Sequence, residues 1–90
     1  METTYQQHVN FLVEPMGNMS VTSLPGIGEV QGQNLEQQGF DKTCVVLGKF
    51  LLLKKDREMF TEWLMDASDA SPHQASACEQ CLRDWCDTFL

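Results

Sequence analysis

The sequence predicts an all-α fold, a compact bundle of five to six helices that occupies residues 1–90 as a single domain. Helix start and stop signals recur along the chain, whereas strand signals are weak. The clearest start is Ser71-Pro72-His73-Gln74, with an N-cap serine, a proline at the first helical position and a glutamine at the third. After this start, apolar residues recur at spacings of three and four up to the C-terminus, which indicates one long amphipathic helix.

Capping residues and helix breakers place the other helices. Thr4 and Gln7 form a capping box, and Pro15 stops the helix that they open. Gly39 stands where a C-terminal glycine would end a helix. The segments expected before residue 71 are therefore 4–15, 21–24, 28–38, 42–53 and 56–67, with Asp41 and Asp56 as the N-caps of the last two. The side chains expected to face inward from residues 56–67 are Met59, Phe60, Trp63, Leu64 and Ala67.

Residues 42–53 form the ambiguous segment. The run Cys44-Val45-Val46-Leu47 alone would also fit a strand, because a short apolar run does not reveal its period. The length of the segment and the helical spacing of Leu47, Phe50 and Leu51 favour a helix. This helix would be apolar nearly all round, and a 90-residue monomer has little material to cover both sides. The excess apolar surface therefore predicts a dimer interface.

Leu24-Pro25-Gly26-Ile27-Gly28-Glu29-Val30 predicts a tight hairpin between two short helices, a helix-hairpin-helix motif over about residues 20–38. Glycine allows a positive φ and lets a ligand approach the backbone, while Ile27 would anchor the loop on the core. In the second helix, Val30 and Leu35 are expected on the inner side. The first N–H groups of that helix have no internal partner, so they can bind a DNA phosphate without a basic side chain. A glycine turn that merely connects two helices would fit the same pattern.

The charge pattern conflicts with such a phosphate site. The chain has a formal charge of −7, and residues 1–41 contain no Lys or Arg. An acidic balance argues against non-specific nucleic-acid binding through bulk electrostatics. Lysines and an arginine gather near residues 49–57, so a local basic region is expected there. No run approaches the length of a membrane span and no leader is evident, so the chain is expected inside the cell with reduced thiols.

Candidate chemical sites are weak. Cys78 and Cys81 share a helical face, and Cys86 and His73 lie nearby in the sequence, which suggests zinc. These residues all belong to one helix, however, and a buried cysteine commonly behaves as a small apolar side chain. A redox pair is less consistent still, because the cysteines do not open a helix after a strand. No nucleophile accompanies either histidine. We therefore expect no metal, no cofactor and no catalytic residues.

Taken over its whole length, the chain resembles the barrier-to-autointegration factor family. The segments that carry the resemblance are Glu14-Pro15-Met16-Gly17, Gly26-Ile27-Gly28-Glu29-Val30, Gly39-Phe40-Asp41-Lys42, Val45-Val46-Leu47-Gly48, Leu53-Lys54-Lys55-Asp56 and Cys81-Leu82-Arg83-Asp84-Trp85-Cys86-Asp87. The resemblance implies a non-catalytic homodimer of the nucleus, chromatin, nuclear envelope and cytoplasm. Such a dimer binds double-stranded DNA without sequence preference and bridges two duplexes. It also implies LEM-domain proteins and lamins as partners.

The resemblance also implies three groups of site residues. The DNA-binding group is Gly26, Ile27, Gly28, Val30, Gln31, Gln6, Gln7, His73, Gln74 and Ser76. The dimer and partner group is Leu47, Gly48, Leu51, Leu52, Lys54 and Met59. The phosphorylation sites are Thr3 and Thr4, although the serine that follows them in the family is Tyr5 here.

The chain departs from the family where side chains would meet phosphate. Neutral or weakly basic residues replace the usual basic ones at Gln7, Gln33, Asn34, Gln38, His73 and Ser76. Each lost phosphate contact removes about 0.9 from the salt dependence of binding. Weakened DNA binding is therefore one hypothesis. A second is a diverged paralogue that dimerises with a basic family member or binds LEM-domain proteins and modulates bridging. A third is a protein-interaction domain of the sterile-alpha-motif kind, against which the hairpin glycines argue.

Overall fold

The structure is a computed structural model that describes residues 19–90. These residues form four α-helices and one 3-10 helix, and they contain no strand beyond an isolated antiparallel bridge between Ser20 and Lys42. The all-α prediction is confirmed. The described residues hold fewer than the expected five to six helices, because the expected helix at 21–24 is only a 3-10 helix over Val21–Ser23. The helix expected at 4–15 falls outside the described residues. The elements are η1 (Val21–Ser23), α2 (Glu29–Gln37), α3 (Thr43–Leu52), α4 (Arg57–Ser68) and α5 (Pro72–Phe89).

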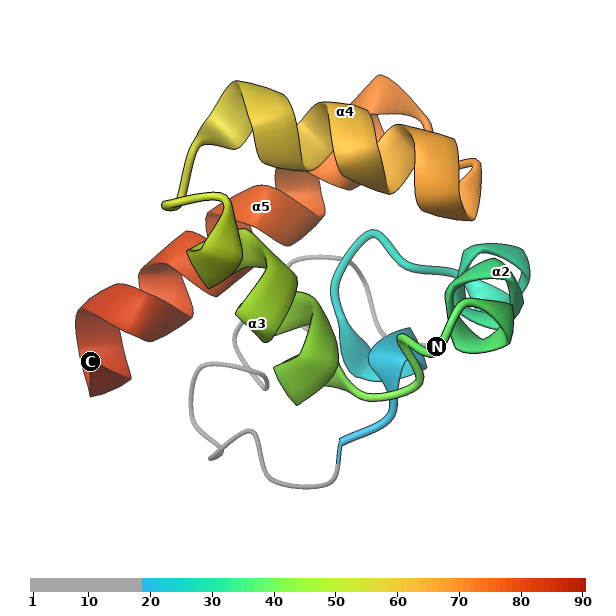
Figure 1. The fold of residues 1–90 in the computed structure, drawn as a ribbon, viewed down its shortest axis with the longest axis horizontal. Helices are drawn as coiled ribbons and strands as arrows, with labels where there is room; N and C mark the ends of the chain where they lie inside the picture. The colour runs from blue at the N-terminus through green and yellow to red at the C-terminus, as the bar shows by residue number, and fades with distance from the viewer. Residues whose placement is uncertain (1–18) are drawn as a thin grey trace.

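The long helix α5 packs against α4 and α3. Figure 1 shows α4 packed along α5, with α2 at the opposite side of the molecule from the C-terminus. Helix α2 contacts both α4 and η1, and α3 contacts both η1 and α5. The short turn η1 therefore lies between α2 and α3. The segment that joins η1 to α2 lies against the beginning of α5, where Gly26 approaches the backbone of Gln74.

The core lies between α5 and the inner faces of the other helices. An edge-to-face pair formed by Phe50 of α3 and Phe60 of α4, with ring centroids 5.1 Å apart, occupies its centre. The apolar stripe predicted for α5 is buried except at its end, where Phe89 is exposed. The buried apolar residues are Val21, Leu24, Ile27, Leu35, Val46, Phe50, Phe60, Leu64, Ala70, Ala75, Cys78, Cys81, Leu82, Trp85 and Cys86.

The helix boundaries follow the capping signals with one exception. Ser71 accepts from the N–H of Gln74, whose side chain in turn accepts from the N–H of Ser71, so the predicted capping box is present. Asp56 accepts from the N–H of Met59 as an N-cap. The expected cap at Asp41 is wrong: α3 begins one residue later, with Lys42 as its N-cap. The Asp41 carbonyl instead accepts from the N–H of Val21 at 3.0 Å.

Gly39 ends α2 through a Schellman motif. Its φ is +90°, its N–H donates to the Glu36 carbonyl, and the next N–H, that of Phe40, donates to the Leu35 carbonyl. The ambiguous segment after it forms α3, a helix, as its length predicted. Only one face of α3 is buried, and the rest of its apolar surface is left exposed.

Candidate nucleic-acid interface

The hairpin between η1 and α2 is a type II turn. The N–H of Ile27 donates to the carbonyl of Leu24 at 3.1 Å, Pro25 occupies the second position and Gly26 has a φ of +84°. This positive φ explains why the third position of the turn is a glycine. Ile27 is only 4% exposed and anchors the turn in the core, as predicted. Leu24 and Pro25 of the turn are buried as well, and Gly26 is half-buried.

Gly26 packs directly on the beginning of α5. A Cβ atom on Gly26 would collide with the carbonyl oxygen of Gln74. Two segments that are about fifty residues apart in the sequence, the hairpin and the first turn of α5, therefore meet through backbone contact. The structure brings together the expected DNA-binding residues of both segments. Gln6 and Gln7 lie outside the described residues, as do Thr3 and Thr4.

The N-terminus of α2 is open because its N-cap is a glycine. Gly28 has no side chain with which to cap the first N–H groups, those of Glu29, Val30 and Gln31. The N–H of Gly28 itself donates to the side-chain oxygen of Gln31 at 3.2 Å. A ligand at Gly28 would have to displace Gln31, a contact that the sequence pattern did not reveal. The prediction that Val30 faces inward is wrong, because its side chain is 62% exposed.

At the beginning of α5, one of the expected DNA-binding side chains already makes a hydrogen bond within the protein and two are exposed. Gln74 uses its amide oxygen in the capping box and is half-buried. His73 and Ser76 are exposed. Of the three residues expected at this position, His73 and Ser76 are the ones whose side chains are available to a ligand.

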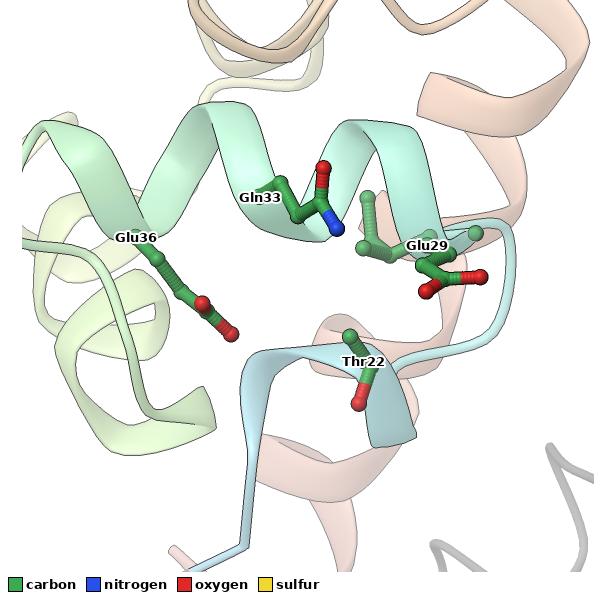
Figure 2. Close-up of a pocket in the computed structure, with 6 residues that line it drawn as sticks. Thr22, Glu29, Gln33 and Glu36 are labelled. Carbon is green, nitrogen blue, oxygen red and sulfur yellow. The ribbon is translucent and has the colours of Figure 1, made fainter.

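An open groove of about 570 Å³ lies between η1 and α2, beside the hairpin. Figure 2 shows Thr22, Glu29, Gln33 and Glu36 around this groove, with Glu29 and Glu36 at its two ends. The remaining lining residues are Ile27 and Gly28. Every lining residue is neutral or acidic. A phosphate approaching the hairpin from this side meets two carboxylates and no compensating cation from the lining.

The expected dimer and partner residues lie mainly on the uncovered face of α3. Leu51 and Leu52 are 40% and 74% exposed, and Gly48 has no atom within 4 Å of where its Cβ would be. Leu47 is half-buried and Lys54 is exposed. Met59, which the sequence also placed on the inner side of its helix, is 53% exposed, so that inward assignment is wrong. Val45 adds a further exposed apolar side chain to this face.

The four cysteines are free thiols in two environments. Cys44 is exposed on α3, whereas Cys78, Cys81 and Cys86 are buried on α5. Burial raises the pKa of Cys78 and raises that of Cys81 to about 12, so these thiols stay protonated. Cys78 belongs to the core, as the apolar interpretation held. Within residues 19–90, no group of three or more His, Cys, Asp or Glu is arranged to hold a metal ion.

Known proteins match the chain along its full length. A family model described as barrier to autointegration factor matches residues 2–89. The chain is similar to barrier-to-autointegration factor from Danio rerio, with 56% identity over 90 residues and all of both chains covered. It is 57% identical to the Homo sapiens protein over 88 residues, which are 98% of this chain and 99% of that one. The Drosophila melanogaster protein is 53% identical over 90 residues.

No helix in the described part of the chain is long and apolar enough to cross a membrane. The match over residues 2–89 and the identity of more than half to relatives of the same length establish the ancestry of the chain. The chain belongs to the barrier-to-autointegration factor family, a non-catalytic family of nuclear, DNA-binding chromatin proteins.

Proposed function

We propose that this chain binds double-stranded DNA without sequence preference through the backbone of its hairpin, with a lower affinity than the basic members of its family. The observation that carries the proposal is the packing of Gly26 on Gln74. It sets the open N-terminus of α2 beside the N-terminus of α5, and helix N-termini attract phosphate through their N–H groups and dipoles. As a homodimer, the chain would present one such site per protomer and bridge two duplexes.

The reduced affinity follows from the side chains around the hairpin. His73 and Ser76 are exposed at the beginning of α5, and Gln33 lines the groove, where the family resemblance leads us to expect basic residues. Glu29 and Glu36 add negative charge to the same groove. Backbone N–H groups can still hold a phosphate, but few counterions are released on binding. The affinity and its salt dependence therefore both fall.

A matched pair of substitutions at each end of α2 tests the hairpin. Val30 is exposed near the N-terminus, and Gln37 is exposed at the C-terminus of the same helix. Val30→Lys should strengthen binding to a labelled duplex and Val30→Asp should weaken it. Gln37→Lys and Gln37→Asp make the same charge changes away from the hairpin and should have much smaller effects. Equal effects at both positions would mean that DNA responds only to net charge and not to the hairpin.

A second candidate function is favoured by the uncovered face of α3. Leu52 is 74% exposed and Met59 is 53% exposed, an apolar surface that a second protein would cover. The chain would use this face to dimerise with itself or with a basic family member, and to bind LEM-domain proteins and lamins. A heterodimer would carry one strong and one weak DNA site and would reduce bridging. Under this proposal, the chain is located at the nuclear envelope and in the cytoplasm as well as on chromatin.

The second candidate is tested by mixing. The chain is combined with a basic family member, and the mass of the complex is measured by light scattering after size exclusion. Heterodimer formation together with reduced joining of two labelled duplexes would support modulation of bridging. If the two proteins remain separate and bridging by the basic protein is unchanged, this function is excluded.

A further inference from the structure

The one fully buried carboxylate that the structure describes belongs to Glu79, in the middle of α5. Its two oxygens accept from two different arginines: Oε1 from Nε of Arg57 and Oε2 from Nε of Arg83, each at 2.8 Å. Burying a charge is costly unless it is paired and hydrogen-bonded, and both conditions are met here. The arrangement links the first residue of α4 to the centre of α5.

The same arginines continue the network on either side. Nη2 of Arg57 donates to the side-chain oxygen Oε1 of Gln80 at 2.8 Å. Arg83 donates through one terminal nitrogen to the backbone carbonyl of Lys55 at 2.7 Å, and its guanidinium carbon lies 5.9 Å from the ring centroid of Phe50. Arg83 is thus fixed at three points: a buried carboxylate, an aromatic face and a loop carbonyl.

The loop that Arg83 holds is conformationally unusual. Lys54 and Lys55 are consecutive and both have a φ of +60°, a region that residues other than glycine enter at an energetic cost. Their N–H groups end α3 by donating to the carbonyls of Leu51 and Phe50. Such a conformation persists only where surrounding contacts determine it. The bond from Arg83 to the Lys55 carbonyl is one of those contacts, and Glu79 orients Arg83.

The loop carries two exposed lysines beside exposed apolar residues. Lys54 and Lys55 follow the C-cap of α3, Leu53. Leu52, just before them, is 74% exposed, and Met59, just after them in α4, is 53% exposed. Figure 1 shows this loop where α3 turns back toward α4, alongside α5. In a chain with a formal charge of −7, these lysines are a local exception. They suit a partner that presents carboxylates next to apolar side chains.

We propose that Glu79 is a positioning residue for the partner-binding face: through Arg83 it holds Lys54 and Lys55 in the conformation that an acidic partner recognises. Glu79 touches no partner itself. This inference rests on the proposed use of the α3 face in partner binding. The geometry that it requires, however, is a property of the chain alone and can be measured separately.

The first measurement needs no partner. Amide hydrogen exchange is followed in Glu79→Gln and in Arg83→Lys, with Glu62→Gln, an exposed glutamate of α4, as the control. In Arg83→Lys, the lysine ammonium still pairs with the buried Glu79 carboxylate. It lacks the second donor group of the guanidinium, which reaches the Lys55 carbonyl. Exchange at Lys54, Lys55 and Asp56 should accelerate by about tenfold in both variants, while the amides of Leu64 and Leu82 stay protected. Uniform acceleration, or none, would overturn the positioning role.

The second measurement is a double-mutant cycle on partner affinity, with a purified LEM domain as the probe. Glu79→Gln should weaken binding by about tenfold in the native background. In the Lys54→Gln, Lys55→Gln background it should have no further effect, because the lysines through which it acts are gone. An equal loss in both backgrounds would mean that Glu79 acts through general stability and would overturn the proposal. If the native chain does not bind the LEM domain, the proposed partner fails, and the exchange measurement alone still decides whether Glu79 positions the loop.

Discussion

Gly26 and Gln74 are in direct backbone contact, and this contact joins the hairpin to the first turn of α5. It leaves no space for a side chain at residue 26. The relationship is structural first, because it fixes the direction of the chain between η1 and α2. It is also the basis of the proposed phosphate site, because it sets two helix N-termini side by side.

The Gly26–Gln74 contact predicts a large difference between two glycine substitutions. Gly26→Ala should lower the free energy of unfolding by about 2–4 kcal/mol, through both a positive φ and a collision with the Gln74 carbonyl. Gly39→Ala is the control, because Gly39 has a φ of +90° but nothing within 4 Å of its Cβ position. It should cost only about 1 kcal/mol. Urea unfolding of both variants measures the difference, and equal losses would show that the Gln74 contact contributes nothing.

Restoring positive charge around the hairpin should restore DNA affinity. His73→Lys and Ser76→Lys place cations at exposed positions in the first two turns of α5, and Gln33→Lys places one between the carboxylates of the groove. Each new phosphate contact should steepen the dependence of log K on log salt by about 0.9. Fluorescence anisotropy with a labelled duplex over a range of salt measures the slope. Stronger binding without a steeper slope would show that the new lysines do not contact phosphate.

Substitutions on the exposed face of α3 should change self-association but leave the free energy of unfolding of the monomer nearly unchanged. Leu52→Glu replaces a side chain that is 74% exposed, so the free energy of unfolding of the monomer should change by less than about 0.5 kcal/mol. Self-association, measured by sedimentation, should be lost because a charge enters the apolar contact. Phe50→Ala, on the buried face of the same helix, should instead cost about 3–5 kcal/mol. Unchanged association of Leu52→Glu would remove this face from the proposed dimer.

The cysteines should differ sharply in reactivity. At pH 8, iodoacetamide should modify Cys44 in the folded protein and leave Cys78, Cys81 and Cys86 unmodified, because burial raises their pKa values and hides them. Mass spectrometry of the alkylated protein identifies the sites, and modification of Cys78 in the folded state would contradict the prediction.

The raised thiol pKa values also make the stability of the protein depend on pH. In the unfolded chain these thiols lose protons near the ordinary value of 9.0, while the folded protein keeps them. The free energy of unfolding should therefore fall as the pH rises above about 9.

Local signals in the sequence predicted most of the fold and only part of the site. The capping box at Ser71, the glycine end of α2 and the buried Ile27 depend on neighbouring residues, so the sequence shows them directly. Contacts between distant segments could not be found in this way. The Gly26–Gln74 contact is one of them, and the pairing of Glu79 with Arg57, 22 residues away, is another.

Some errors had a local cause. Asp41 is a good N-cap by residue type, but its carbonyl is used by Val21, so α3 begins after Lys42 instead. Met59 and Val30 lie near the first turns of their helices, where the inner face is set by how the preceding loop enters. Periodicity alone does not determine that direction. Both side chains are exposed as a result.

We infer that the hairpin keeps a phosphate-binding backbone although the basic side chains expected around it are replaced by neutral ones. The most direct test is a salt titration of duplex binding by the unmodified chain, measured beside a basic member of the family. The account predicts weak binding, with a log K that depends less steeply on log salt than that of the basic relative, by about 0.9 for each missing contact. Nanomolar binding at physiological salt, with a slope equal to that of the basic relative, would contradict it.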